Sequence, residues 1–326
     1  MSDEPKFFST DSPTVFFENT AVGRMKKELW EATDAEIEAV LAEYGMPSPC
    51  EWAKPGAYIQ TTVRHQLNIE RSKNDVVLIP VGCTELHGDH TVSAVDTLFV
   101  SQICEGVRRF MAKDGGNPPA LAIPPLMYGA HPYHHIGMPG TVIVRDQIVV
   151  EQLVDVMLGL WNDGWRKQII LNNHGQLWVL EEALHEFCKR YQLPGIYRVI
   201  DWHRAVREFF HTKDEGGKWD TNFVHADESE TSLGLYLFPE MVDMNYAVDA
   251  SGVSYLPDGH LDKSVDPFRR PCKWSEGEGH AAIEITGTPE GVVGRATVSD
   301  AEKAKRPLAA ILRYLTLLVN EIAAAF

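Results

Sequence analysis

The sequence has few cysteines and no closely spaced cysteine pair. Five cysteines occur in 326 residues, and no two of them form a Cys-x-x-Cys motif. An odd number of widely spaced cysteines argues against a disulfide framework, and the missing motif argues against a zinc site built from thiolates. This usage is typical of a reducing compartment, so we predict that the protein is cytoplasmic.

Long apolar runs and an excess of positive charge are also missing. No stretch of about 18 apolar residues occurs, and the first eleven residues are polar and acidic, unlike a secretion signal. The 30 Lys and Arg residues are outnumbered by 46 Asp and Glu residues, which leaves a formal charge of −16. Such a chain repels the phosphate backbone of nucleic acids. We therefore predict neither a membrane nor a nucleic acid as a partner.

From residue 74 onward, short apolar segments alternate with amphipathic ones. The apolar segments are bounded by Gly, Pro or Asn, which is typical of strands covered on both faces. We predict strands over 76–81, 120–123, 168–171 and 195–200. We predict helices over 94–112, 146–163, 177–191, 229–237 and 300–324. This alternation predicts a layered α/β/α fold with a mostly parallel central sheet.

The first 70 residues follow a different pattern. Prolines interrupt this region, and one helix is predicted over 33–44. We interpret residues 1–70 as an N-terminal extension packed on the core, and residues 71–326 as the main domain. The extension is interpreted as a passive arm, with a lid or an oligomer contact as the alternatives.

Side chains that commonly bind metals follow the first predicted strand of the main domain. Glu85 and His87 come directly after it, and Asp96 begins the next predicted helix. Residues two apart in an extended segment point the same way, and open α/β sheets bind ligands at the carboxyl ends of their strands. Two carboxylates and an imidazole suit Zn²⁺ or Mn²⁺. The alternative is a polar loop that caps a helix.

Histidines also follow two other predicted strands. His174 comes after the strand at 168–171, and parallel neighbours would bring it to the same edge of the sheet as Glu85. The segment from Tyr128 to Thr141 contains three histidines, including His135, together with prolines and glycines. That composition fits either a binding loop or an ordered, turn-rich connection.

A further polar segment leads into the predicted helix at 229–237. It contains His225, Asp227, Glu228 and Glu230. Acidic side chains are common in the first turn of a helix, so a structural role is the alternative to a functional one.

Together these segments resemble the creatininase family of metal-dependent hydrolases. The resemblance covers about residues 76 to 300 and rests on four motifs in the same order. These motifs are Glu85-x-His87 with Asp96; Tyr128-Gly129 with His135 and Met138-Pro139-Gly140-Thr141; Leu171-Asn172-Asn173-His174-Gly175; and His225 through Glu230-Thr231-Ser232. The resemblance implies a creatininase-like fold for residues 71–326.

The resemblance also implies a site with two divalent metal ions, either Zn or Mn. Glu85, Asp96 and His174 would bind one ion. His87, the bridging Asp96 and Glu230 would bind the other.

Catalytic and substrate-binding roles are implied in the same way. His225 would transfer a proton beside the metals, and Glu228 would assist it. Gln176 departs from creatininase, which has a glutamate ligand there, so the second ion has to use Glu230. The residues implied to contact the substrate are Tyr128, His135, Trp202, Trp219 and Asp227. For the two tryptophans, a place in the core or an interface is the alternative.

The segment 17–30 is similar to a branch of this family that hydrolyses 3-dehydro-scyllo-inosose in inositol and L-glucose breakdown. This similarity implies that a metal-bound hydroxide attacks a ring carbonyl of a small cyclic substrate and that a carbon–carbon bond breaks. One alternative is a cyclic amide or formamide amidohydrolase, and another is a non-catalytic metal or sugar-binding protein. Because members of the family commonly assemble, a homo-oligomer is expected.

Overall fold

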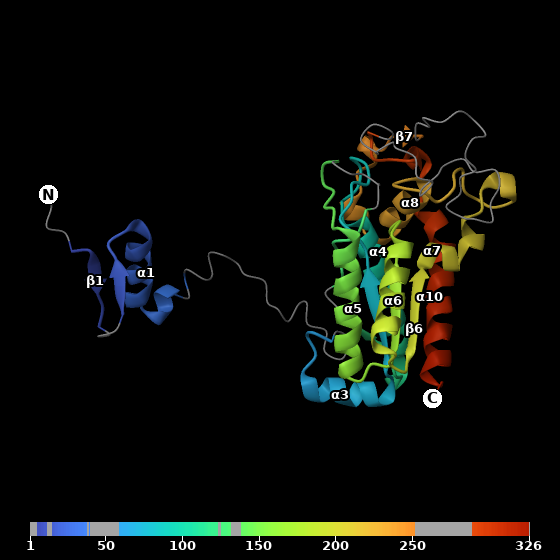
Figure 1. Cartoon of the computed structure of the whole chain (residues 1–326). Coiled ribbons are helices and arrows are strands. Elements are labelled where there is room, and N and C mark those ends of the chain that lie inside the picture. Colours follow the sequence, from blue (N-terminus) through green and yellow to red (C-terminus); the bar gives the residue numbers. More distant parts are fainter. Residues whose placement is uncertain are drawn as a thin grey trace. The chain divides into compact units, whose positions relative to one another are not determined.

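The computed structural model describes residues 5–11, 15–37, 39, 59–122, 125–131, 138–251 and 289–325. The chain divides into two compact units, Met1–Ala53 and Lys54–Phe326 (Figure 1). Helix α3 (Arg64–Lys73) belongs to the larger unit because its Leu67 is buried in that unit's core. The boundary between units therefore falls before residue 70, whereas packing of the extension on the core stays a prediction.

The smaller unit contains a two-stranded antiparallel sheet and one helix. Strand β1 (Phe7–Ser9) pairs with β2 (Phe16–Glu18), and α1 (Ala21–Glu31) follows. Gly23 is the only buried residue among the described residues of this unit. Half of the helix predicted over 33–44 lies outside the described residues.

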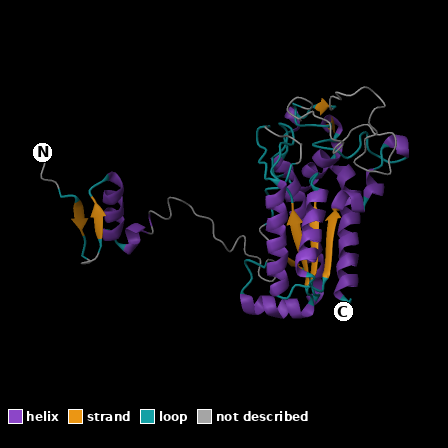
Figure 2. Cartoon of the chain, in the orientation of Figure 1, coloured by secondary structure: helices purple, strands orange, loops and turns teal. Residues whose placement is uncertain are grey.

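The larger unit is built on a four-stranded sheet in the order β4-β3-β5-β6, and all of its pairings are parallel (Figure 2). Its strands are β3 (Val76–Val81), β4 (Ala120–Leu121), β5 (Lys167–Asn172) and β6 (Ile196–Asp201). Val81 lies opposite Asn172, so the segments that follow β3 and β5 leave the sheet at the same edge. The predicted parallel sheet is confirmed.

Helices cover both faces of this sheet, because alternate residues of each strand point to opposite sides. Val76 and Leu78 belong to a core with α4 (Val95–Met111), α8 (Glu228–Leu237) and α10 (Ala301–Ala323). Val77 and Ile79 belong to a second core with α5 (Asp146–Asn162) and α6 (Leu177–Tyr191). The predicted α/β/α fold is thus confirmed.

The remaining named elements are short. Helix α7 (Trp202–Ala205) follows β6 directly, and β7 (Asp249–Ala250) pairs antiparallel with β8 (Gly294–Arg295). Within the described part of the chain, no helix has the length and apolar character needed to cross a membrane.

His203 in α7 is expected to make the fold sensitive to acid. Its ring stacks on Phe223 with centroids 4.2 Å apart, and burial together with Arg204 lowers the pKa of His203 to about 3. The unfolded chain takes up this proton near pH 6.5, so the ring lowers the stability of the fold as the pH falls from about 6.5 to 3. The free energy of unfolding of the wild-type protein should fall between pH 8 and pH 4. In His203→Phe we expect this fall to be smaller by about 3 kcal/mol.

Urea denaturation at both pH values measures this effect. The control is His185→Phe, because this histidine is exposed on α6. An equal acid sensitivity of His203→Phe and the wild-type protein would contradict the prediction.

Candidate metal centre

All five predicted metal ligands meet at the carboxyl edge of the sheet. Glu85 and His87 follow β3, His174 follows β5, and Asp96 and Glu230 lie in the first turns of α4 and α8. All five side chains are buried, with exposed fractions of 1 to 4%. Polar groups are buried this deeply only when other polar groups or ions surround them.

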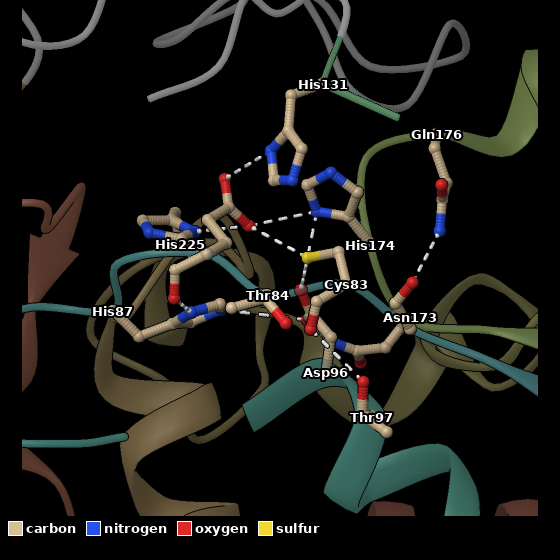
Figure 3. Close-up of polar contacts among 12 residues, drawn as sticks. Cys83, Thr84, His87, Asp96, Thr97, His131, Asn173, His174, Gln176 and His225 are labelled. Atoms are coloured by element: carbon tan, nitrogen blue, oxygen red, sulfur yellow. Dashed lines mark hydrogen bonds and ion pairs between the residues drawn. The ribbon is translucent and has the colours of Figure 1, made fainter. Parts of the chain in front are cut away.

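His174 faces two carboxylates. Its Nδ1 lies 2.9 Å from Oε2 of Glu85 and 3.4 Å from Oδ2 of Asp96 (Figure 3). Its Nε2 lies 2.9 Å from the carbonyl oxygen of Ala130, which accepts a hydrogen bond from it. This hydrogen bond uses Nε2 as the donor, so Nδ1 is the ring nitrogen directed at the two carboxylates.

His87 has the same arrangement on the other side of Asp96. Its Nδ1 lies 3.0 Å from the carbonyl oxygen of Glu85. Its Nε2 lies 3.7 Å from Oδ1 of Asp96 and 3.5 Å from Oε2 of Glu230. The two oxygens of Asp96 therefore face two different histidines, which is the geometry of a carboxylate that bridges two cations.

The separations between these atoms suit a shared cation. Two ligand atoms about 2.1 Å from one zinc ion lie about 3.4 Å apart at the tetrahedral angle. Metal-binding histidines typically donate one ring N–H to a backbone carbonyl and direct the other nitrogen at the metal site. His87 and His174 have this arrangement. His87 Nε2 has no hydrogen-bond partner among the described residues. Two groups of side chains could thus hold a metal ion, one of Cys83, Glu85, His131 and His174 and the other of His87, Asp96 and Glu230.

The charges in this cluster shift the pKa values of its members. Burial opposes protonation of His87, but Asp96 and Glu230 outweigh it and raise the pKa of His87 to about 10. Burial would raise the pKa of Asp96, yet His87 and His174 hold it well below its usual value. Burial raises the pKa of Glu230 to about 8. In the absence of a metal ion, protons on His87 and Glu230 therefore offset the negative charge of Asp96, and a cation would replace those protons.

Asn173 connects the two halves of the cluster, although the sequence analysis assigned it no role of its own. Its side-chain amide donates to Asp96 and to Oε1 of Glu230, the latter over 3.1 Å. Its amide oxygen accepts a hydrogen bond from the indole of Trp202, which is fully buried. Trp202 therefore lies behind the ligands and orients them through Asn173, whereas the prediction placed it against the substrate.

Gln176 is close to the cluster but hydrogen-bonds to the chain around it. Its side chain accepts from the amide of Ala130 over 2.9 Å and donates to the carbonyl oxygen of Gly82 over 3.1 Å and to Asn172 over 3.2 Å. These contacts join the segments that follow β3 and β5.

His225 reaches the cluster, and its proton-transfer role stays a prediction. Its Nε2 lies 2.7 Å from the carbonyl oxygen of Leu86, and its Nδ1 lies 3.9 Å from Oε2 of Glu85. Its ring lies against that of His87, with centroids 4.2 Å apart. Only Nδ1 of His225 is therefore directed into the cluster.

The sequence analysis missed two members of the cluster, Cys83 and His131. Cys83 Sγ donates to Oδ2 of Asp96 over 2.7 Å, and burial together with the adjacent carboxylates raises the pKa of this thiol well above its usual value. His131 Nδ1 lies 3.8 Å from Oε1 of Glu85. Cys83 alternates with Glu85 along one extended segment, and this spacing could have identified it.

Asp227 and Glu228 stabilise the start of α8 and do not face the cluster. Asp227 accepts hydrogen bonds from the amides of Ser229 and Glu230, as an N-cap residue does. Glu228 is fully buried, accepts from the amide of Asp220 over 2.6 Å and pairs with Lys303. The structure thus places neither carboxylate where catalysis or substrate binding was predicted.

Two of the other predicted substrate contacts, Trp219 and Tyr128, also lie elsewhere. Trp219 is buried in the core, where it stacks on Phe210 and donates to the carbonyl oxygen of Phe209 over 2.7 Å. Tyr128 is 53% exposed and lines a surface groove of about 1030 Å³ beside α5. His135 lies outside the described residues.

The fold and the cluster define an α/β protein with a candidate two-metal centre at the carboxyl edge of its sheet. The family model described as creatininase, creatinine amidohydrolase, matches residues 62–319. The chain belongs to the creatininase family and is a metal-dependent hydrolase.

Individual relatives agree with this assignment. The chain is 44% identical to a 3-dehydro-scyllo-inosose hydrolase of Thermotoga maritima over 271 residues, which cover 83% of this chain and 85% of the relative. A solved structure described as "Creatininase Mn" matches with a TM-score of 0.64 and 20% identity, covering 82% of this chain and 98% of that one. A creatininase variant of the Zn-Zn type matches with a TM-score of 0.63 and 17% identity, with the same coverage. At these identities the two structures support the fold alone.

Proposed function

We propose that this protein hydrolyses 3-dehydro-scyllo-inosose, or a closely similar cyclic polyol ketone, with two divalent ions, either Zn or Mn. The 44% identity to a hydrolase of that name supports the substrate. The metal pair is supported mainly by one observation, the two oxygens of Asp96 facing His174 and His87. The bond cleaved would be a carbon–carbon bond of the ring.

The residues of the chain have distinct parts in this proposal. Glu85, Asp96 and His174 would hold one ion, and His87, Asp96 and Glu230 the other. Divalent ions lower the pKa of water and stabilise a developing oxyanion. Cleavage beside a second ketone leaves an enolate carbon that has to be protonated.

His225 is the residue that we propose to deliver this proton. Its Nε2 is held by the carbonyl oxygen of Leu86, so only Nδ1 can exchange a proton with the substrate. That nitrogen lies 3.9 Å from Oε2 of Glu85, beside the proposed ions, and histidine is a common proton donor near neutral pH. The proton would move from Nδ1 to the carbon that departs.

Amide hydrolysis is the second candidate, because the family model is described as creatinine amidohydrolase. Incubating the Mn- and Zn-loaded chain with 3-dehydro-scyllo-inosose and with creatinine separates the two. We expect ring opening of the ketone, followed by NMR, that is lost on chelation and restored by the metal. Faster turnover of creatinine would favour the amidohydrolase, and tight metal binding without any turnover would favour a binding protein.

We also propose that the protein acts in the cytoplasm as a homo-oligomer on small molecules. Size-exclusion chromatography with light scattering tests the oligomeric state. A monomer at micromolar concentration would contradict that part of the proposal.

Replacing Trp202 by phenylalanine is expected to weaken metal binding about tenfold. The variant keeps an aromatic ring in the core but removes the indole donor to Asn173, which positions Asp96 and Glu230. Isothermal titration of the metal-free protein with Zn²⁺ measures the change. Trp219→Phe is the matched control, because Trp219 is equally buried and its indole bonds to Phe209, so it should bind metal normally. Equal affinities in both variants would show that Trp202 does not position the ligands.

A further inference from the structure

His131 is a buried histidine that the proposed mechanism does not use. Its exposed fraction is 2%, and neither ring nitrogen has a hydrogen-bond partner among the described residues. Burying an imidazole without partners is costly, so a group of this kind calls for an explanation.

The ring of His131 lies at the edge of the metal centre. Its Nδ1 is 3.8 Å from Oε1 of Glu85, and its centroid is 4.5 Å from that of His174 (Figure 3). Cys83, Glu85, His131 and His174 each offer one potential ligand atom. These four atoms lie within 4.8 Å of one another. His131 thus lies beside the two ligands of the first ion.

These distances fit a shared ion better than a hydrogen bond. A separation of 3.8 Å is too long for a hydrogen bond between Nδ1 and Oε1. Two ligand atoms about 2.1 Å from the same ion are separated by about 3.4 Å at the tetrahedral angle and by about 4.2 Å when they lie on opposite sides of it. The spacing between His131 and Glu85 falls within this range, and imidazole is a common ligand of Zn²⁺.

We propose that His131 is a further ligand of the ion held by Glu85, Asp96 and His174. This inference rests on the proposed two-metal hydrolase. The first ion then has four side-chain ligands, whereas the second has His87, Asp96 and Glu230. A position with three protein ligands stays open to water and substrate, as catalytic metal positions do. The substrate carbonyl would therefore bind at the second ion.

Metal binding by His131→Ala and His131→Gln tests the proposal in the full-length chain. The metal-free proteins are titrated with Zn²⁺ by calorimetry and with Co²⁺ by visible absorption, and far-ultraviolet circular dichroism confirms folding. We expect the affinity for the tighter ion to fall at least about tenfold, and the cobalt bands of that ion to change. His185→Ala is the control, since it removes an exposed histidine on α6.

Imidazole provides a second measurement for His131→Ala. Free imidazole can enter the space left by the missing ring and restore the ligand, so it should recover part of the zinc affinity and the wild-type cobalt spectrum. Unchanged zinc affinity and cobalt spectra in both variants would overturn the proposal, even if their turnover falls. Weaker metal binding in a protein that does not open the cyclic ketone would support the ligand while contradicting the proposed substrate.

Discussion

Asp96→Asn is expected to abolish turnover and to prevent binding of the metal pair. Asparagine keeps the size of the side chain but removes the negative charge and one of the two anionic oxygens that face His87 and His174. Replacing a residue that hydrogen-bonds to a metal ligand lowers metal affinity or activity by up to about 100-fold. Loss of a bridging ligand should cost more, because it weakens both positions at once.

Metal analysis by inductively coupled plasma mass spectrometry after dialysis measures the occupancy of Asp96→Asn, and the ring-opening assay measures its turnover. Asp146→Asn is the matched control, because Asp146 also lies in the first turn of a helix, α5, but outside the cluster. The control should retain full occupancy and turnover. If Asp96→Asn kept both ions, Asp96 would not be a bridge.

Lys303→Met is expected to destabilise the fold by about 3 kcal/mol. Lys303 on α10 pairs with Glu228, whose carboxylate is fully buried at the start of α8. Removing the cation leaves a buried negative charge that water cannot reach, and this charge costs more than the pair contributes. The amides of Asp220 and Thr221 that donate to Glu228 compensate for only part of that cost.

Urea denaturation of the metal-saturated protein measures this loss. The double variant Glu228→Gln/Lys303→Met should recover part of the stability, because it no longer buries a charge. Lys305→Met is the control, since Lys305 forms an exposed pair with Glu302 and should lose less than about 1 kcal/mol. A loss equal to that of the control would mean that water reaches Glu228 in the folded protein.

The sheet and part of the centre could be predicted from the sequence, because both follow local rules. The strand at 76–81 is a continuous apolar run, and the structure places its ends at those residues. Glu85 and His87 alternate beyond that strand, and parallel pairing brings the residues after β5 to the same edge. Strand order therefore placed His174 at the predicted site, and the resemblance to the creatininase family assigned it as a ligand.

The roles of other residues depend on contacts that the sequence does not reveal. Glu228 and Glu230 both lie in the first turn of α8, and two residues along a helix point to different sides, so only Glu230 faces the cluster. Trp202 and Trp219 are equally buried, and only their hydrogen-bond partners distinguish them. His131 lies in a turn-rich segment whose path the sequence pattern leaves undefined.

The ion pair between α8 and α10 also affects when the centre can form during synthesis. Helix α10 follows every ligand-bearing segment in the chain, so the ribosome adds it after all the ligands have been made. Until Lys303 emerges, Glu228 has no cation to neutralise it, and the first turn of α8 that carries Glu230 is incompletely supported. A nascent chain stalled before α10 also lacks the core side chains that pack on α4 and α8, so it should hold neither ion and gain activity only after release.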